Sequence, residues 1–358
     1  MNVVRPFPAR VVQQGSAQPA VTAASDSLDE MGADVVRIAV DPDGYDESAA
    51  ALYLYRQRDE GGSHTGVVCE VGVQAFMDGQ IRGHEAVDPR RVEALIRHHA
   101  TTTGPPALVT LLHRAGPSFT RALEATSRTE PILDFDGPRG IRQTVWRMAK
   151  GPATSAVTEE LAAAQLYIAD GHHRVAAALE DWRLAGKPRE AGVLCVVHPM
   201  DDLRLLAFHR RVTGRVDPTE LIALLSAGFQ VRAVSQPPAP TPGSFGLYVE
   251  RSWYNLTYQG NRGDGPEGLD IAVLEARLAE RLDRLTPSPS YTLEIAPTQM
   301  PVDELTNRCD ADGGALFMLA PPPLEVISEL ADVGQVMPPK TTYFAPKPCA
   351  GIFLRPRQ

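Results

Sequence analysis

The chain has 358 residues, a formal net charge of −9, 43% hydrophobic residues and 22% charged residues. This is the composition of an ordinary globular protein with a sizeable core, and the length suits two or three domains or one composite domain. The negative charge argues against a nucleic-acid partner, because such proteins neutralise many phosphates. The four cysteines are far apart and form no Cys-x-x-Cys pair, which disfavours a zinc site or a disulfide framework.

The sequence also bears on location. It contains no apolar run of about 18 residues, and its first ten residues lack the apolar segment of a signal peptide. We therefore expect a cytoplasmic protein without a membrane partner.

Up to residue 146 the patterns predict paired strands and two helices. Residues 48–56 have the composition of a helix start that passes into a strand, and residues 65–74 form its mostly apolar hairpin partner. Asp88 followed by a proline predicts a capped helix over 89–99. The other elements predicted here are strands at 3–12 and 107–113, a helix at 118–125 and a hairpin at 131–146.

Beyond residue 146 helices continue to alternate with strands and hairpins. Hairpins mixed with helices indicate an α+β fold with mixed sheets and flanking helices, not a doubly wound parallel sheet. We expect an N-terminal region over 1–130, a core over 131–235 and a C-terminal region over 236–358, packed separately or as one composite domain. The predicted elements are helices at 156–165, 172–184, 218–227, 271–285 and 322–331, strands at 166–170, 193–198, 203–209 and 314–320, a hairpin at 245–258 and an extended stretch at 340–353.

The most informative stretch is residues 166–179. It reads as an apolar strand, the turn Asp170-Gly171-His172-His173-Arg174, and an alanine-rich helix. Glycine lets the backbone approach a ligand closely, and the first N–H groups of a helix point towards an anion. The turn therefore predicts an anion site. The structural alternative is that Asp170 only caps the helix, with the histidines half buried beside it.

Several pieces of the sequence resemble one family. These segments are Arg5-Pro6-Phe7, residues 52–56, 81–85 and 170–174, Phe208-His209-Arg210, Leu269-Asp270-Ile271 and residues 337–347. Through them the chain resembles the domain-of-unknown-function family 1015 (DUF1015) over nearly its whole length.

The central turn is also similar to the corresponding motif of archaeal and staphylococcal free-serine kinases, which have a ParB/sulfiredoxin-like fold. This resemblance implies a ParB/sulfiredoxin-like catalytic core and a nucleotide-dependent phosphotransferase. Its implied acceptor is the hydroxyl of a free amino acid, L-serine first, with O-phosphoserine as product. ATP or ADP would be the donor and Mg²⁺ the metal. The alternative is a non-catalytic nucleotide-binding switch of the ParB type. A PLP-dependent enzyme that uses the product is a further expected partner.

Phosphoryl transfer needs a phosphate cradle, charge neutralisation and a group that orients the attacking hydroxyl. Under the resemblance, Gly171 and His172 belong to the cradle and Arg174 grips phosphate oxygens bidentately. Asp170 holds Mg²⁺, directly or through water. His172 and His173 donate to phosphate or orient the acceptor, although adjacent residues in a turn diverge.

The general base is assigned to Glu85, with His84 beside it as a substrate contact. The alternative for Glu85 is a solvated residue at a helix entry. Asp134 and Asp136 share one face of a predicted strand. They are alternative metal ligands or ordinary hairpin carboxylates.

Two basic clusters complete the candidate site. His209 and Arg210, followed by Arg211, either meet an anionic substrate or form a charged strand end. Lys340 is assigned to a phosphate or carboxylate contact in a proline-rich segment that Lys347 closes. The alternative is a C-terminal strand packed on the sheet.

The sequence departs from the family pattern in two places. The Pro-Pro-Tyr-Asp segment common after the N-terminal Pro-Phe is absent from residues 21–26. Gln143 or a neighbour stands where histidine is common. If either feature contacts substrate in the family, specificity or activity differs here.

Overall fold

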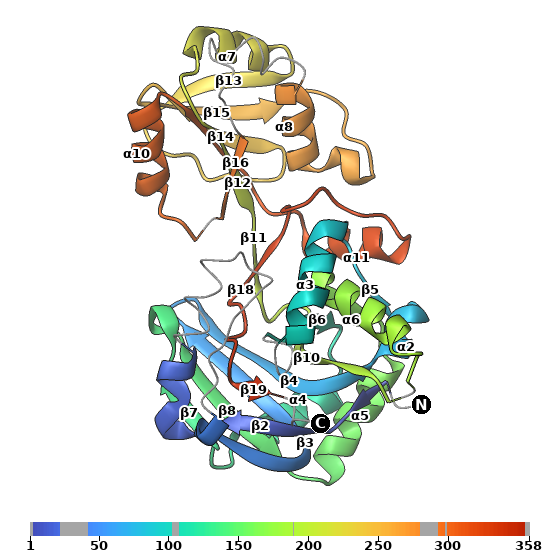
Figure 1. Cartoon of the computed structure of the whole chain (residues 1–358). Coiled ribbons are helices and arrows are strands. Elements are labelled where there is room, and N and C mark those ends of the chain that lie inside the picture. The colour runs from blue at the N-terminus through green and yellow to red at the C-terminus, as the bar shows by residue number, and fades with distance from the viewer. Residues whose placement is uncertain are drawn as a thin grey trace. The chain divides into compact units, whose positions relative to one another are not determined.

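The computed structural model describes residues 3–21, 42–101, 107–188, 190–279, 293–297 and 299–354. These residues divide into two compact units (Figure 1). The first unit comprises Met1–Gly83, Val87–Arg204 and Pro346–Gln358, and the second comprises His84–Ala86 and Leu205–Ala345. The predicted boundary at 130 falls within the first unit, and the one at 235 falls within the second.

The first unit is built on an eleven-stranded mixed sheet. Its main path runs β19-β2-β3-β4-β10-β6-β9-β5, with β1 beside β4 and the β7–β8 hairpin beside β3. The β10–β6 and β5–β9 pairs are parallel, whereas the others are antiparallel. The strands are β1 (Val4–Arg5), β2 (Phe7–Val12), β3 (Tyr45–Asp59), β4 (Gly62–Gly72), β5 (Ile81–Arg82), β6 (Val109–His113), β7 (Leu133–Asp136), β8 (Arg142–Met148), β9 (Leu166–Asp170), β10 (Gly192–Pro199) and β19 (Phe353–Leu354).

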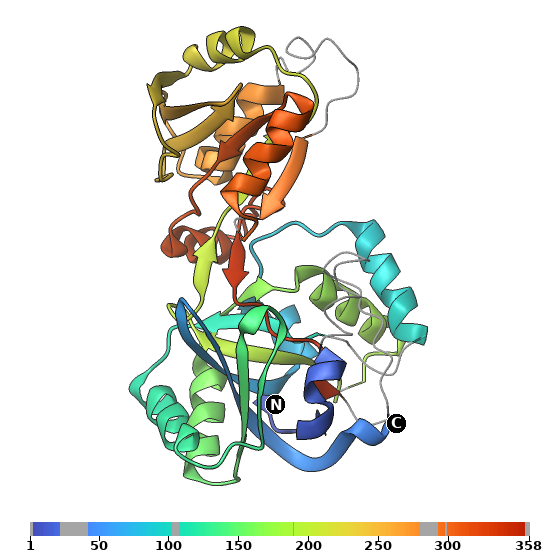
Figure 2. The ribbon, with the colours of Figure 1, turned by 90° about the vertical axis from the view of Figure 1, so that its left-hand side faces the viewer.

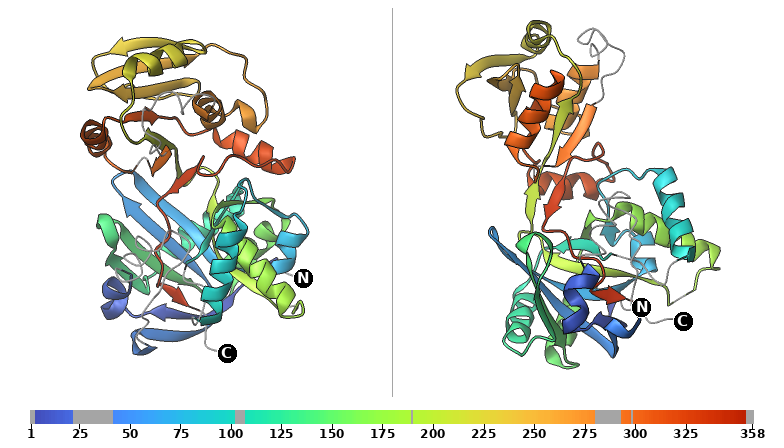
Figure 3. Two further views of the ribbon diagram at one scale, coloured as in Figure 1. Left: turned by 45° about the horizontal axis from the view of Figure 1, so that its top comes forward. Right: turned by 60° about the vertical axis from the view of Figure 1, so that its left-hand side comes forward.

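Both faces of this sheet are buried. Successive side chains of a strand point to opposite faces, so Leu52 and Leu54 join one core cluster while Tyr53 and Tyr55 join the other. Helices α3 and α6 of this unit pack side by side (Figure 3). The helices of the unit whose bounds the structure describes are α2 (Val73–Met77), α3 (Pro89–Thr101), α4 (Pro117–Ser127), α5 (Pro152–Ala163) and α6 (His172–Leu184).

Two predicted elements were wrong in detail. Residues 48–51 are strand, because Ser48 pairs with Ala9 and Ala51 pairs with Phe7 in the β2–β3 ladder. The ladder outweighs the weak helix preference of the alanines. The strand predicted at 203–209 is divided between β11 (Arg204–Leu206) and β12 (Phe208–Val212), which belong to different sheets.

The second unit contains a six-stranded antiparallel sheet in the order β13-β15-β14-β17-β12-β16. Helix α10 packs on one face of it through Leu305 and Cys309 (Figure 2). β11 pairs separately with β18 (Tyr343–Ala345). The other elements are α7 (Pro218–Ser226), β13 (Phe229–Val234), β14 (Ser244–Val249), β15 (Ser252–Tyr258), α8 (Asp270–Ala279), β16 (Leu293–Pro297), α10 (Val302–Asp312), β17 (Ala315–Met318) and α11 (Leu324–Asp332).

The sheets and helices together confirm the α+β class. The ParB/sulfiredoxin-like core stays a prediction. Residues 22–26, where a family segment was sought, and residues 280–285 of the helix predicted at 271–285 lie outside the described residues. Within the described ranges, no helix is both long enough and apolar enough to cross a membrane.

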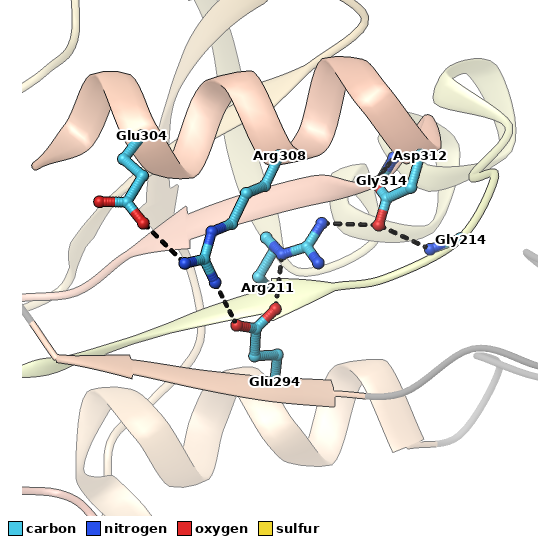
Figure 4. A network of polar contacts seen from close by, with 7 residues as sticks. All are labelled: Arg211, Gly214, Glu294, Glu304, Arg308, Asp312 and Gly314. Carbon is cyan, nitrogen blue, oxygen red and sulfur yellow. Dashed lines mark hydrogen bonds and ion pairs between the residues drawn. The ribbon is translucent and has the colours of Figure 1, made fainter. Parts of the chain in front are cut away.

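A network of charged side chains joins β12, β16 and α10 (Figure 4). Arg211 lies 2.7 Å from both Glu294 and Asp312, and Arg308 links Glu294 to Glu304. Burial would lower the pKa of Arg211, but the hydrogen bonds to Asp312 and Glu294 outweigh it and raise the pKa. Arg211 therefore ties elements of the second unit together.

Candidate functional site

The predicted turn between strand and helix is formed in the first unit. β9 ends at Asp170 and α6 begins at His172, with Gly171 between them at φ 99°. This left-handed conformation favours glycine. A Cβ atom on Gly171 would also lie only 3.0 Å from the Arg174 guanidinium. Both the backbone and the close approach of Arg174 therefore require glycine here.

Two cations meet the Asp170 carboxylate. Arg174 Nη2 donates to Oδ2 at 2.5 Å, and the Lys347 ammonium donates to Oδ1. The Arg174 side chain is 7% exposed, and those of Asp170 and Lys347 are 27% and 29% exposed. Burial alone would raise the pKa of Asp170, but Lys347 and Arg174 outweigh it and hold the pKa below its ordinary value. Asp170 is therefore a carboxylate at neutral pH.

Arg174 is more occupied than the sequence suggested. Its Nη1 donates to the Leu108 carbonyl at 2.6 Å, so both terminal nitrogens already have partners. A bidentate grip on phosphate through these two nitrogens would require that they leave those partners. Among the residues that the structure describes, the buried Nε has no hydrogen-bond partner, and neither has Oγ1 of Thr110, which pairs with Asp170 in the β6–β9 ladder. Buried polar atoms without partners are costly, so these two atoms can still accept a ligand contact.

Lys347 is the site residue that sequence analysis missed. Gln57 Nε2 donates to the Lys347 carbonyl at 2.9 Å. Two residues later the Cys349 N–H donates to the Tyr55 hydroxyl, which itself donates to Gln143 Oε1 at 2.5 Å. These contacts fasten the segment that carries Lys347 to β3 and β8. The only sequence signal was its place at the end of the 337–347 motif.

The two histidines of the turn have different surroundings, as expected of neighbours in a turn. His173 Nε2 accepts a hydrogen bond from the Asp88 N–H at 2.9 Å, next to the start of α3. His172 lies against Gly83, where a Cβ atom would be 3.0 Å from its ring. Both are buried. His173 thus fixes a loop in this structure, and the catalytic roles of both histidines stay predictions.

In the second unit, two further family segments meet. The His84 carbonyl accepts the Met337 N–H at 2.7 Å, and His84 Nε2 lies 3.1 Å from Thr342 Oγ1. Glu85 Oε1 accepts a long hydrogen bond of 3.5 Å from the Lys340 N–H. His84 is buried and Glu85 is half-buried. Glu85 is therefore engaged with the C-terminal motif, and its role as base stays a prediction.

The basic cluster after β11 is built into the second unit. Arg210 is fully buried, its Nε donates to Glu275 at 2.9 Å, and its Nη2 reaches the carbonyls of Pro339 and Lys340. His209 Nδ1 accepts the Leu319 N–H at 3.2 Å. Burial, followed by the charge of Arg210, lowers the pKa of His209 to about 4. His209 Nδ1 and the Arg210 guanidinium are thus engaged in internal bonds, and the substrate contact of both residues stays a prediction.

Lys340 has an unusual backbone. Its φ is 57°, in the left-handed region that residues with a Cβ avoid. Its Nζ lies 5.6 Å from the centre of the Phe208 ring. Together with Thr341 it lines a cavity of about 440 Å³ within the second unit.

The carboxylates do not by themselves form a magnesium site. Both oxygens of Asp170 contact cations. Arg142 pairs with Asp134 at 2.6 Å and with Asp136 at 3.2 Å, so the alternative metal ligands form a hairpin ion pair. Among the described residues, no group of three or more histidine, cysteine, aspartate or glutamate side chains is arranged to hold a metal. Asp170 as a Mg²⁺ ligand stays a prediction.

Comparison with known proteins identifies the family. The model of the family described as "Protein of unknown function (DUF1015)" matches residues 45–285. The chain belongs to this family, as the sequence resemblance predicted. No curated protein matches the chain.

Several solved structures are similar at low identity. A free serine kinase in complex with AMP has 17% identity and a TM-score of 0.41, covering 78% of this chain and 87% of that chain. A conserved hypothetical protein from Pyrococcus furiosus has 16% identity and a TM-score of 0.41, covering 81% of this chain and 95% of that chain. SbnI with a C-terminal truncation, from Staphylococcus aureus, has 12% identity and a TM-score of 0.42, covering 80% and 87%.

Proposed function

We propose that the protein binds nucleotide phosphates at the turn from Asp170 to Arg174 and transfers a phosphoryl group from ATP or ADP to a free amino acid, L-serine first. The supporting observation is the convergence of Arg174 and Lys347 on the single carboxylate of Asp170. Two cations and one carboxylate leave one positive charge, and the N-terminus of the thirteen-residue helix α6 adds a partial one. A bound anion would neutralise the charge of the cluster and the partial charge of the helix N-terminus. Arg174 Nε and Thr110 Oγ1 would be further hydrogen-bond donors to this anion.

In the proposed reaction the acceptor hydroxyl oxygen forms a bond to the terminal phosphorus. The bond from phosphorus to the bridging oxygen breaks, and the shortened nucleotide leaves with that electron pair. The hydroxyl proton passes to the Glu85 carboxylate, and His84 is the proposed acceptor contact. Arg174 and Lys347 neutralise charge on the phosphate oxygens, and the N–H groups at His172 complete the cradle. Mg²⁺ enters the proposal only as the companion of the nucleotide.

The test uses the full chain with ATP or ADP, with and without Mg²⁺, and with serine, threonine or homoserine as acceptor. Phosphorus NMR should show a phosphomonoester with serine. Lys347→Met should weaken nucleotide binding in calorimetry, because it removes the net positive charge of the cluster. Glu85→Gln should keep nucleotide binding and lose turnover by about 10²- to 10⁴-fold. The exposed Glu124→Gln is the matched control and should behave as wild type.

Two results would decide against the kinase. If no donor yields a phosphorylated amino acid while nucleotide still binds and Lys347→Met weakens that binding, the turn is a nucleotide-binding switch. If Lys347→Met and wild type bind nucleotide alike, the turn is not the phosphate site.

A further inference from the structure

The cavity beside Lys340 lies entirely within the second unit and goes beyond the proposed kinase site. Its walls are mostly apolar, and a volume of about 440 Å³ falls in the range of small-molecule sites. The apolar residues that line it include Phe208, Leu269, Ile271, Leu319, Val326 and the prolines 321–323.

The two cations that line this cavity differ in their pairing with the acids that the structure describes. Arg262 also lines the cavity, but it is paired with Asp270, which additionally accepts the Gly243 N–H at 3.1 Å. Lys340 forms no ion pair with any residue that the structure describes, and its ammonium instead faces the Phe208 ring. A lysine ammonium next to apolar walls is a favourable place for an anion, because less water screens the charge there.

The backbone around Lys340 is held in its strained form from two sides. Glu85 accepts its N–H, and Arg210 reaches its carbonyl at 3.3 Å. The Thr341 hydroxyl donates to the Pro338 carbonyl at 2.6 Å and closes the turn. A left-handed residue with a Cβ is strained and persists where its surroundings enforce it, often at functional sites. Glu85 and Arg210 thus hold the turn that carries the ammonium.

We propose that this cavity binds a small carboxylic acid with an apolar body, its carboxylate paired with Lys340 and its body packed against Ile271 and Leu319. A monoanion is favoured over a phosphate dianion because two further acids, Asp264 and Glu329, also line the cavity. Both acids are exposed, so water screens their repulsion of a bound carboxylate more than it screens the attraction between that carboxylate and Lys340. This assignment replaces the nucleotide contact predicted for Lys340.

The test is a titration followed by methyl NMR, with Ile271 and Leu319 as reporters. The probes are cyclohexanecarboxylate, its neutral carboxamide and cyclohexyl phosphate. We expect the carboxylate to shift both methyl signals with a Kd near 1 mM, a scale typical of a ligand with few atoms. The carboxamide and the phosphate should bind at least tenfold more weakly.

Lys340→Met should raise the Kd of the carboxylate at least tenfold and leave that of the carboxamide unchanged. Lys187→Met is the matched control. Like Lys340, Lys187 has a positive φ, of 61°, and its Nζ lies 5.8 Å from the centre of the Trp182 ring. Unlike Lys340, it is exposed and does not line this cavity. The Lys187→Met variant should bind as wild type.

Several results would overturn the proposal: no shift at Ile271 with any probe at about 20 mM, equal binding of acid and amide, tighter binding of the phosphate, or unchanged binding in Lys340→Met. If Lys340→Met fails to fold, Lys340→Gln replaces it, and the comparison of acid with amide on wild type still decides.

Discussion

Lys340 and Lys347 belong to the same short motif but lie in different chemical settings. Lys347 belongs to the first unit and contacts a carboxylate that a second cation also holds. Lys340 belongs to the second unit, where its ammonium faces an aromatic ring and an apolar cavity. The first lysine is part of an ion cluster, whereas the second forms no ion pair with any residue that the structure describes. The same residue type is therefore paired with a carboxylate in one unit and not in the other.

The largest effect should come from the ion cluster. Asp170→Ala leaves Arg174 and Lys347 as adjacent cations without a carboxylate, and we expect a loss of about 3 kcal/mol in the free energy of unfolding. Urea denaturation at pH 7 measures it. Asp136→Asn, which removes an exposed partner of Arg142, is the control and should cost less than about 1 kcal/mol.

The double variant Asp170→Ala/Lys347→Met isolates the like-charge repulsion. It should be more stable than Asp170→Ala alone, because one of the two uncompensated cations is gone. If Asp170→Ala costs no more than Asp136→Asn, the cluster is an ordinary surface pair and the contrast between the two lysines fails.

A second prediction contrasts the pH response of the two units. His209 is buried and neutral, and its pKa is lowered from 6.5 to about 4. Below about pH 6.5 the imidazole of His209 therefore binds a proton in the unfolded chain but not in the folded one. The free energy of unfolding falls as the pH drops towards 4. The pKa of Asp170 is also lowered, so its contribution is present above its unfolded value of 3.8 and is lost only below it. At pH 5 His209 weakens the fold while Asp170 does not.

The variant His209→Asn tests this difference, because its side-chain oxygen can accept the Leu319 N–H without titrating. Between pH 7 and pH 5 the free energy of unfolding should fall by about 2 kcal/mol more in wild type than in the variant. His113 has a similarly lowered pKa, but it is present in both proteins and cancels. Parallel pH profiles would show that His209 is protonated in the fold.

The sequence predicted what depends on neighbouring residues. The apolar strand, the turn at Gly171 and the alanine-rich helix were predicted from their local pattern, and both histidines were placed at the start of that helix. The contact between Lys347 and Asp170 spans 177 positions and follows from the packing of the C-terminal segment on β3, which no local pattern encodes. For the same reason the sequence analysis did not assign Lys347 to the turn, and the site role that it gave to Lys340 stays a prediction.

At residues 48–51 the local sequence pattern predicted the wrong element. Their alanines favour a helix locally, but an adjacent strand supplies ladder hydrogen bonds to them. The burial and bonding of His209 and Arg210 could not be predicted either, because an exposed charged strand end and a buried, hydrogen-bonded one can have the same sequence. Burial and the positions of Glu275 and Leu319 distinguish the two.

The smallest predicted effect concerns the backbone of Lys340. Lys340→Gly relieves the cost of a positive φ, whereas Lys340→Ala keeps it, and both remove the ammonium. We expect the glycine variant to be more stable than the alanine variant by about 1 kcal/mol, measured by thermal or urea unfolding. Lys187→Gly and Lys187→Ala should differ by a similar amount, since Lys187 has the same backbone conformation. Both Lys340 variants should lose carboxylate binding, whereas both Lys187 variants should keep it. If Lys340→Gly is no more stable than Lys340→Ala, the turn that Glu85 and Arg210 contact is not strained. The position of the ammonium would then depend only on its packing against Phe208.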